Sequence, residues 1–289
     1  MNPPGSGPQF RPLLPGEVPS ALRLSRLAGW NQTEADWERL VRLNPAGVCV
    51  WRDQEEVRAS FSVTPYQGTQ RIGWIGMILV DPAFRNRGIG SAALAAALHH
   101  IREQGLDLAG LDATDLGEPV YRKHGFVSIR PMTRWRGRLK FGGGPLPDSP
   151  CAPPPLEAVA AFDQRCSGVD RSPLFHHLLQ SGARLLALKE ETGDLAAFGF
   201  LRPGREAWQL GPVVAPRESR IPPLFDAVVQ LVGEGNECLC DVPDGAIPQD
   251  QLRAVGMEAS RHLQRMTLPA GRDVLCGPGI RCVSAFEMG

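Results

Sequence analysis

The sequence predicts a mixed α/β fold built from two tandem units. Three observations support this prediction. A strand-like segment at 74–80 runs into a glycine-containing turn and then into an alanine- and leucine-rich helix. A segment rich in proline and glycine interrupts the chain near its middle. Beyond that segment the order of helix-like and strand-like stretches partly repeats, which is typical of a tandem of related units.

The N-terminal half alternates helix-like and strand-like stretches. A short strand at 10–14 precedes an amphipathic helix at 18–27. The next helix begins near Thr33, with Asp36 placed as the acid of a capping box. The other expected elements are an antiparallel meander of strands at 47–53, 57–66 and 71–80, a helix at 91–105, a strand at 106–114, a short helix at 117–125 and a strand at 126–137.

A linker is expected at 140–155, because its glycines and prolines carry no periodic pattern. It divides the chain into a domain at 1–139 and a domain at 156–289. Parts of the second half echo parts of the first: the stretch 210–216 is similar to 75–82, and the stretch 256–267 is similar to 125–135.

Composition favours small-molecule partners. The formal net charge is zero, so the basic surface of a nucleic-acid-binding protein is not expected. No apolar run approaches the roughly 20 residues of a membrane-spanning helix, and the first residues lack the order of a signal peptide. We therefore expect a cytoplasmic protein that binds no membrane. The seven cysteines follow no zinc-ligand spacing, so we expect free thiols and no metal.

The turn between the strand at 74–80 and the following helix has the features of an anion-binding site. The first N–H groups of a helix lack intrahelical partners, and the helix dipole adds positive charge there. Gly88 and Gly90 allow the backbone to approach a pyrophosphate closely, because neither carries a Cβ. Ser91 adds a hydroxyl group, and Arg85 and Arg87 add charge.

Two motifs in this half resemble those of the GNAT superfamily of acetyl-CoA-dependent N-acyltransferases. Arg85, Gly88 and Gly90 match its R-x-x-G-x-G motif, and a V-D-P sequence at 80–82 precedes them. A Y-x-K-x-G-F motif follows at 121–126. The resemblance covers roughly residues 9–139 and implies two GNAT-like units, each with a mostly antiparallel, twisted sheet flanked by helices. The second half resembles the C-terminal unit of tandem members of the family.

The resemblance also implies where acetyl-CoA binds. The strand at 74–80 should splay from the strand at 107–114, with pantetheine inserted between them, and Gly76 lies where a bulge could open the ladder. The implied cofactor contacts are Ile78, Leu79, Val80, Arg85, Asn86, Arg87, Gly88, Ile89, Gly90, Ser91, Tyr121 and Lys123.

The expected reaction is transfer of the acetyl group to a primary amine of a small molecule or peptide by direct attack. The resemblance implies that Tyr121 is the general acid that protonates the leaving thiolate. Several residues remain open as the general base, with Asp112 as the first candidate beside Thr114 and Asp36. The expected acceptor contacts are Trp30, Asn31, Asp36 and Thr114, although helix capping and core packing explain Trp30 and Asn31 equally well.

The second half lacks both motifs. Where the first half has its glycine turn, the second reads PRESRIPPLF, with two prolines and no glycine, and proline has no N–H to offer a phosphate. Three roles are then open to this half: it closes the acceptor site, forms a homodimer, or only stabilises the first unit. The alternative to an enzyme is a sensor or scaffold that binds acyl-CoA without turnover.

Overall fold

The computed structural model describes residues 7–141, 153–271 and 273–289. In the first unit the elements follow the predicted order. They are β1 (Arg11–Pro12), α1 (Val18–Leu27), α2 (Glu34–Leu43), β2 (Val48–Asp53), β3 (Glu56–Gly68), β4 (Ile72–Val80), α3 (Ile89–Glu103), β5 (Leu108–Ala113), α4 (Glu118–Lys123) and β6 (Val127–Arg138).

The second unit repeats this arrangement after the predicted linker, which lies largely outside the described residues. Its elements are α5 (Leu156–Ser167), β7 (Val169–Asp170), α6 (Ser172–Gln180), β8 (Arg184–Lys189), β9 (Leu195–Arg202), β10 (Trp208–Val214), α7 (Ile221–Val232), β11 (Glu237–Pro243), α8 (Gln249–Ala254), β12 (Met257–Leu268) and β13 (Ile280–Cys282).

The capping box predicted for α2 is confirmed. The Thr33 backbone N–H donates to Asp36 Oδ2 at 2.8 Å, and Thr33 accepts in return from the third residue of the helix. This reciprocal pair satisfies two N–H groups that the helix start would otherwise leave without partners.

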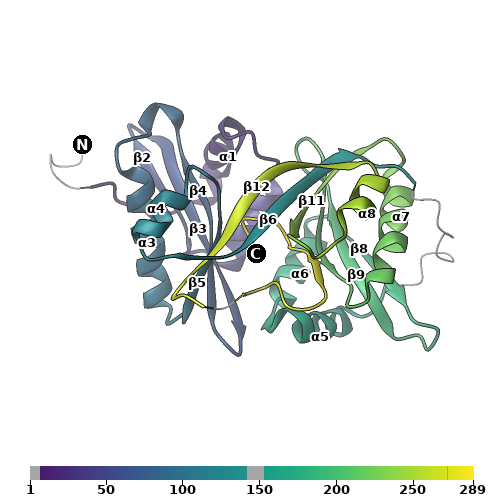
Figure 1. Cartoon of the computed structure of the whole chain (residues 1–289). Coiled ribbons are helices and arrows are strands. Elements are labelled where there is room, and N and C mark those ends of the chain that lie inside the picture. The colour runs from purple at the N-terminus through teal and green to yellow at the C-terminus, as the bar shows by residue number, and fades with distance from the viewer. Residues whose placement is uncertain (1–6, 142–152, 272) are drawn as a thin grey trace.

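The mixed α/β, mostly antiparallel fold is also confirmed, and the two units share one continuous sheet. Its strand order is β1-β2-β3-β4-β5-β12-β6-β11-β10-β9-β8. The units exchange their long terminal strands: β12 of the second unit pairs with β5 of the first, and β6 of the first unit pairs with β11 of the second. Figure 1 shows β6 and β12 running side by side across the centre of the molecule.

Hydrophobic cores cover both faces of the first unit's sheet. Side chains of α3 pack with Phe61, Val63 and Ile75 in one cluster. On the opposite face, α1 and α2 pack in a second cluster that also includes Phe175 of α6 and Phe198 of β9. This second cluster therefore joins the two units through apolar contacts. A third cluster fills the space between the sheet and the helices α7 and α8 of the second unit.

Residues 283–289 lie between the two units and are held by both. The indole Nε1 of Trp74 donates to Phe286 O at 2.9 Å, and the Tyr66 hydroxyl donates to Met288 O. From the second unit, Asp241 Oδ2 accepts from the Phe286 N–H at 3.3 Å. These bonds fix the segment against the first unit's sheet.

Candidate functional site

The strands β4 and β5 separate as the resemblance implies. Their parallel pairing runs from Ile72 to Trp74 on β4 and ends there. The following residues of β4 and β5 have no ladder between them, so both strands present unpaired backbone groups to the space between them. This wedge is the feature that an extended, amide-containing ligand requires.

Gly76 has a different role from the predicted one. The irregularity in the β3–β4 ladder falls between Leu79 and Gly76, where Met77 adopts a positive φ of 51°. Gly76 itself is paired, and a Cβ there would lie 2.5 Å from Glu287 O. The bulge is therefore centred on Met77 and Ile78, and Gly76 allows the C-terminal segment to approach the strand.

The turn after β4 has the geometry of an anion site. A short 3₁₀ turn, capped by Asp81, leads to Gly88, which has a φ of 75° and precedes the first residue of α3. The first backbone bond into the helix is donated by Ala92 to Gly88 O at 3.0 Å, so the N–H groups of the preceding residues have no partner within the helix. A Cβ at Gly88 would meet no protein atom within 4 Å.

Two arginine side chains are fixed at this turn. Arg85 Nε donates to Val80 O at 3.2 Å, and Arg87 Nη2 donates to Ala83 O at 3.1 Å, which fixes both arginines over the loop. Both are exposed, as are Asn86, which adopts a φ of 61°, and Lys123 at the end of α4. Open space, unpaired N–H groups and cationic side chains together fit a pyrophosphate.

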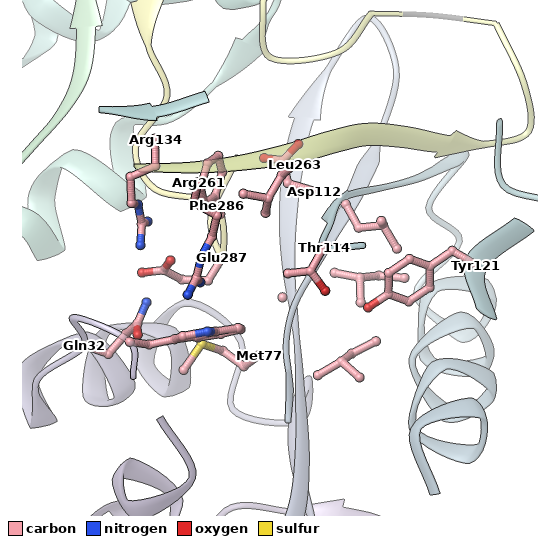
Figure 2. A pocket seen from close by; sticks show the side chains of 15 residues that line it. Gln32, Met77, Asp112, Thr114, Tyr121, Arg134, Arg261, Leu263, Phe286 and Glu287 are labelled. Carbon is pink, nitrogen blue, oxygen red and sulfur yellow. The ribbon is translucent and has the colours of Figure 1, made fainter. Parts of the chain in front are cut away.

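A pocket opens at the splay of β4 and β5. It collects residues from both units. Figure 2 shows Tyr121 and Thr114 on one side, and Gln32, Arg134 and Glu287 on the other. The complete lining is Trp30, Gln32, Ile75, Gly76, Met77, Ile78, Leu111, Asp112, Thr114, Tyr121, Arg134, Arg261, Leu263, Phe286 and Glu287.

Tyr121 reaches the pocket from α4. Its ring lies against Gly117, where a Cβ would lie 2.7 Å from Tyr121 Cε2, and its centroid is 6.1 Å from that of Phe126. Burial raises the pKa of Tyr121 to about 12. The phenol therefore keeps its proton at neutral pH and is available to donate it.

Asp112 faces the pocket but is held in an ion pair. Its two carboxylate oxygens accept from Arg265 Nε at 2.8 Å and Arg265 Nη2 at 2.7 Å, and both side chains are fully buried. Burial raises the pKa of the Asp112 carboxyl, and Arg265 opposes that shift. A base needs a free lone pair directed at the amine. The pair with Arg265 gives Asp112 a structural role instead.

The acceptor contacts expected of Asn31 and Asp36 are not supported by their positions, because neither lines the pocket. Asn31 donates to Ala207 O at 2.9 Å and accepts from the Glu206 N–H at 2.8 Å, so it joins the two units. Asp36 pairs with Arg39 at 2.7 Å and with Arg202 at 2.9 Å. By contrast, the predicted residues Trp30 and Thr114 do line the pocket.

Several lining residues were not predicted from the sequence. Ile75, Met77 and Leu111 lie on the two splayed strands, and Gln32 is next to Asn31. The others come from segments distant in the chain and without a motif, and they are Arg134, Arg261, Leu263, Phe286 and Glu287. One signal in the sequence could have indicated the residues on β6 and β12, namely the similarity of 256–267 to 125–135. Equivalent strands of two tandem units can exchange places between the two halves of the sheet, and this exchange brings residues of the second unit to the first unit's pocket.

The second unit contains an equivalent splay, and the chain itself fills it. The parallel strands β10 and β11 pair from Trp208 to Leu210 and then separate. In the space beyond, β13 pairs with β10, and the Val283 N–H donates to Asp241 O on β11 at 2.9 Å. A Cβ at Gly211 would lie 2.1 Å from Val283 O. The protein's own strand thus occupies the position that a ligand's amides would take.

The described residues contain neither a membrane-spanning helix nor a cluster of metal-binding side chains. Within 7–141, 153–271 and 273–289, no helix is long and apolar enough to cross a membrane. The same residues hold no group of three or more histidine, cysteine, aspartate or glutamate side chains that could bind a metal ion.

Models of acetyltransferase families match both units. The model described as "Acetyltransferase (GNAT) family" matches residues 19–126, and the one described as "Acetyltransferase (GNAT) domain" matches residues 159–272. The fold and the family matches define an acyltransferase. More particularly, the chain belongs to the GNAT acetyltransferases and carries two GNAT units in tandem. Enzymes of this fold use acetyl-CoA as a cosubstrate.

Curated relatives and solved structures agree with this assignment. A mycothiol acetyltransferase of Segniliparus rotundus is 30% identical over 129 residues, which cover 39% of this chain and 49% of the relative. A mycothiol acetyltransferase of Propionibacterium freudenreichii is 32% identical over 105 residues, covering 34% of this chain and 32% of the relative. The chain therefore spans about half of the first relative and a third of the second.

Two solved structures share the whole fold. A protein of Pyrococcus horikoshii that is assigned as an acetyltransferase has a TM-score of 0.81 at 20% identity, covering 100% of this chain and 98% of its own. A tandem GNAT protein from the clavulanic acid biosynthesis pathway has a TM-score of 0.66 at 18% identity, covering 92% of this chain and 100% of its own.

Proposed function

We propose that the protein transfers the acetyl group of acetyl-CoA to a primary amine of a small molecule or peptide. The observation that carries this proposal is the combination, in the first unit, of an open β4–β5 wedge, a free helix N-terminus after β4, and Tyr121 lining the pocket at the wedge. The wedge suits pantetheine and the helix start suits the pyrophosphate. The thioester is then directed toward the pocket.

The chemistry needs no covalent intermediate with the enzyme. A neutral amine attacks the thioester carbonyl, and the leaving thiolate takes a proton. Tyr121 is the proposed donor of that proton, because its phenol is protonated at neutral pH and its side chain lines the pocket. Thr114 lies beside it and accepts from the Gly117 N–H at 3.3 Å, which fixes the start of α4.

The acceptor side of the pocket carries the cationic side chains of Arg134 and Arg261 and the carboxyl group of Glu287. Arg134 is paired with Asp241 at 2.7 Å, whereas the side chain of the half-buried Arg261 forms no ion pair or hydrogen bond among the described residues. Burial lowers the pKa of Arg261. An acceptor that carries an anionic group near its amine would match Arg261, so the proposed acceptor class is a small amine or peptide with such a group.

Thiol release from acetyl-CoA tests the proposal. The full chain is assayed with a panel of amino acids, peptides and their amides. Because two relatives are named mycothiol acetyltransferase, the acceptor of those enzymes is included in the panel. Tyr121→Phe should lower acceptor-dependent turnover by roughly a hundredfold, the usual effect of losing a general acid, while acetyl-CoA affinity is unchanged. Tight binding of acetyl-CoA without thiol release for any amine would instead support the sensor.

A further inference from the structure

The pocket contains two buried oxygen atoms that accept no hydrogen bond. They are Oε1 of Gln32 and Oε1 of Glu287, and the two residues are only 5% and 3% exposed. Both residues line the pocket on the same side (Figure 2). A buried acceptor without a donor is unfavourable, because it has lost its hydrogen bonds to water. A ligand that brings hydrogen-bond donors to this pocket would therefore supply what both oxygen atoms lack.

Hydrogen bonds to the backbone on either side of Glu287 hold this residue in place. Its neighbours Phe286 and Met288 accept hydrogen bonds from Trp74 and Tyr66 of the first unit. Gly76 lies so close to Glu287 that a Cβ there would meet Glu287 O and Cα. The segment is consequently fixed beside β4, at the bulge where the wedge opens, and the side chain enters the pocket.

The charged groups around Glu287 leave its Oε1 without a hydrogen bond. Arg202 Nη2 forms an ion pair with Glu287 Oε1 at 3.6 Å, which is too long for a hydrogen bond. The same arginine forms a shorter ion pair with Asp36 at 2.9 Å. Arg134 is already paired with both oxygens of Asp241, at 2.7 and 2.8 Å. The positive charges of Arg202 and Arg134 favour the ionised form of Glu287, and neither arginine donates a hydrogen bond to Oε1.

We propose that Glu287, carried by the C-terminal segment into the first unit's pocket, binds the acceptor ammonium together with Gln32 and removes its proton. This inference rests on the proposed function and replaces Asp112 as the base. An ammonium group has three N–H donors, enough to satisfy both free oxygens. The second unit then takes part in the chemistry, because it supplies this carboxylate through the exchanged end of the chain.

The step balances as follows. One ammonium proton moves to the Glu287 carboxylate, and the nitrogen lone pair forms a bond to the thioester carbon. The C–S bond breaks, and Tyr121 gives its proton to the thiolate. The nitrogen, now bonded to the acetyl group, loses a second proton, which returns to Tyr121. The products are an amide and a free thiol, and Glu287 releases its proton to solvent.

The pH dependence has a definite sign. Burial raises the pKa of the Glu287 carboxyl above its ordinary value, and only the ionised form accepts a proton. Acceptor kcat/KM should therefore fall as the pH decreases through this raised pKa. The charged and titratable groups that face Glu287 are Arg39 and Asp36 on α2, Tyr66 on β3, Arg134 on β6 and Arg202 on β9.

The test compares three variants in the full chain. Glu287→Gln should lower acceptor kcat/KM at least a hundredfold and abolish the acid limb of the pH profile, with acetyl-CoA affinity unchanged. Glu287→Asp keeps the carboxylate and should retain the acid limb at an intermediate rate. Glu258→Gln, at an exposed position of β12, is the matched control and should match the parent.

The outcomes separate this inference from the proposed function. If the parent acetylates an amine and Glu287→Gln stays within twofold of it with the same acid limb, the role of Glu287 is overturned and the proposed function stands. If the Gln variant does not fold, two other results would contradict the role of Glu287. One is a pH profile of the parent that has no acid limb, and the other is full activity of Glu287→Asp without an acid limb. A parent that releases no thiol with any amine overturns both.

Discussion

Asp112 and Arg265 face each other on the paired strands β5 and β12, and their fully buried side chains form a bidentate ion pair. The sequence suggested Asp112 as a base because it lies near the end of a strand that flanks the thioester. Its partner lies 153 residues further along the chain, and no local pattern reveals it. The same limitation applies to Asn31, whose amide bonds a loop of the second unit.

Replacing Asp112 should therefore affect stability more than catalysis. Asp112→Asn leaves the buried Arg265 guanidinium without its counter-ion, which should reduce the free energy of unfolding by about 3–5 kcal/mol. Urea denaturation measures this change, and Asp250→Asn, at a side chain that is 97% exposed, is the control. Unchanged stability combined with a large loss of turnover would return Asp112 to the position of general base.

At the scale of elements, the parts predicted best are those contained in one continuous segment. The passage from β4 through the glycine turn to α3 is such a segment, and so is α4 with Tyr121. Turn chemistry and helix starts are local properties, so the sequence specifies them directly. The pairing partner of β12 is not a local property. The two units have equivalent terminal strands, β6 and β12, and a local pattern does not say which of the two pairs with β5 and which with β11. The exchange was therefore not predicted, nor was the acceptor side of the pocket that depends on it.

The cofactor turn provides a prediction at this scale. Gly90→Val adds a side chain in the first turn of α3, where a Cβ has only Val80 Cγ2 nearby, at 3.9 Å. The fold should tolerate it, but the backbone could no longer approach a pyrophosphate. Calorimetry should show at least a tenfold loss of acetyl-CoA affinity. Ala95→Val, on the exposed side of the same helix, controls for the β-branched residue, and equal affinities in the two variants would contradict the assigned turn.

At the scale of the whole molecule, strand exchange makes the two units interdependent. The first unit's sheet contains β12 of the second, and its pocket contains Phe286 and Glu287. The path of the C-terminal segment links two further features, since β13 fills the second unit's wedge and the residues after it reach the first unit's wedge. The same segment thereby closes one potential ligand groove and completes the other.

The stoichiometry of acetyl-CoA binding tests this account most directly. The first unit's wedge is open and the second unit's equivalent is filled by β13, with prolines where the anion-binding glycines would be. Calorimetric titration of the full chain should therefore give one acetyl-CoA per chain, and the affinity of that single site should fall at least tenfold in Gly90→Val. Two sites in the parent, or one undiminished site in the variant, would contradict the account.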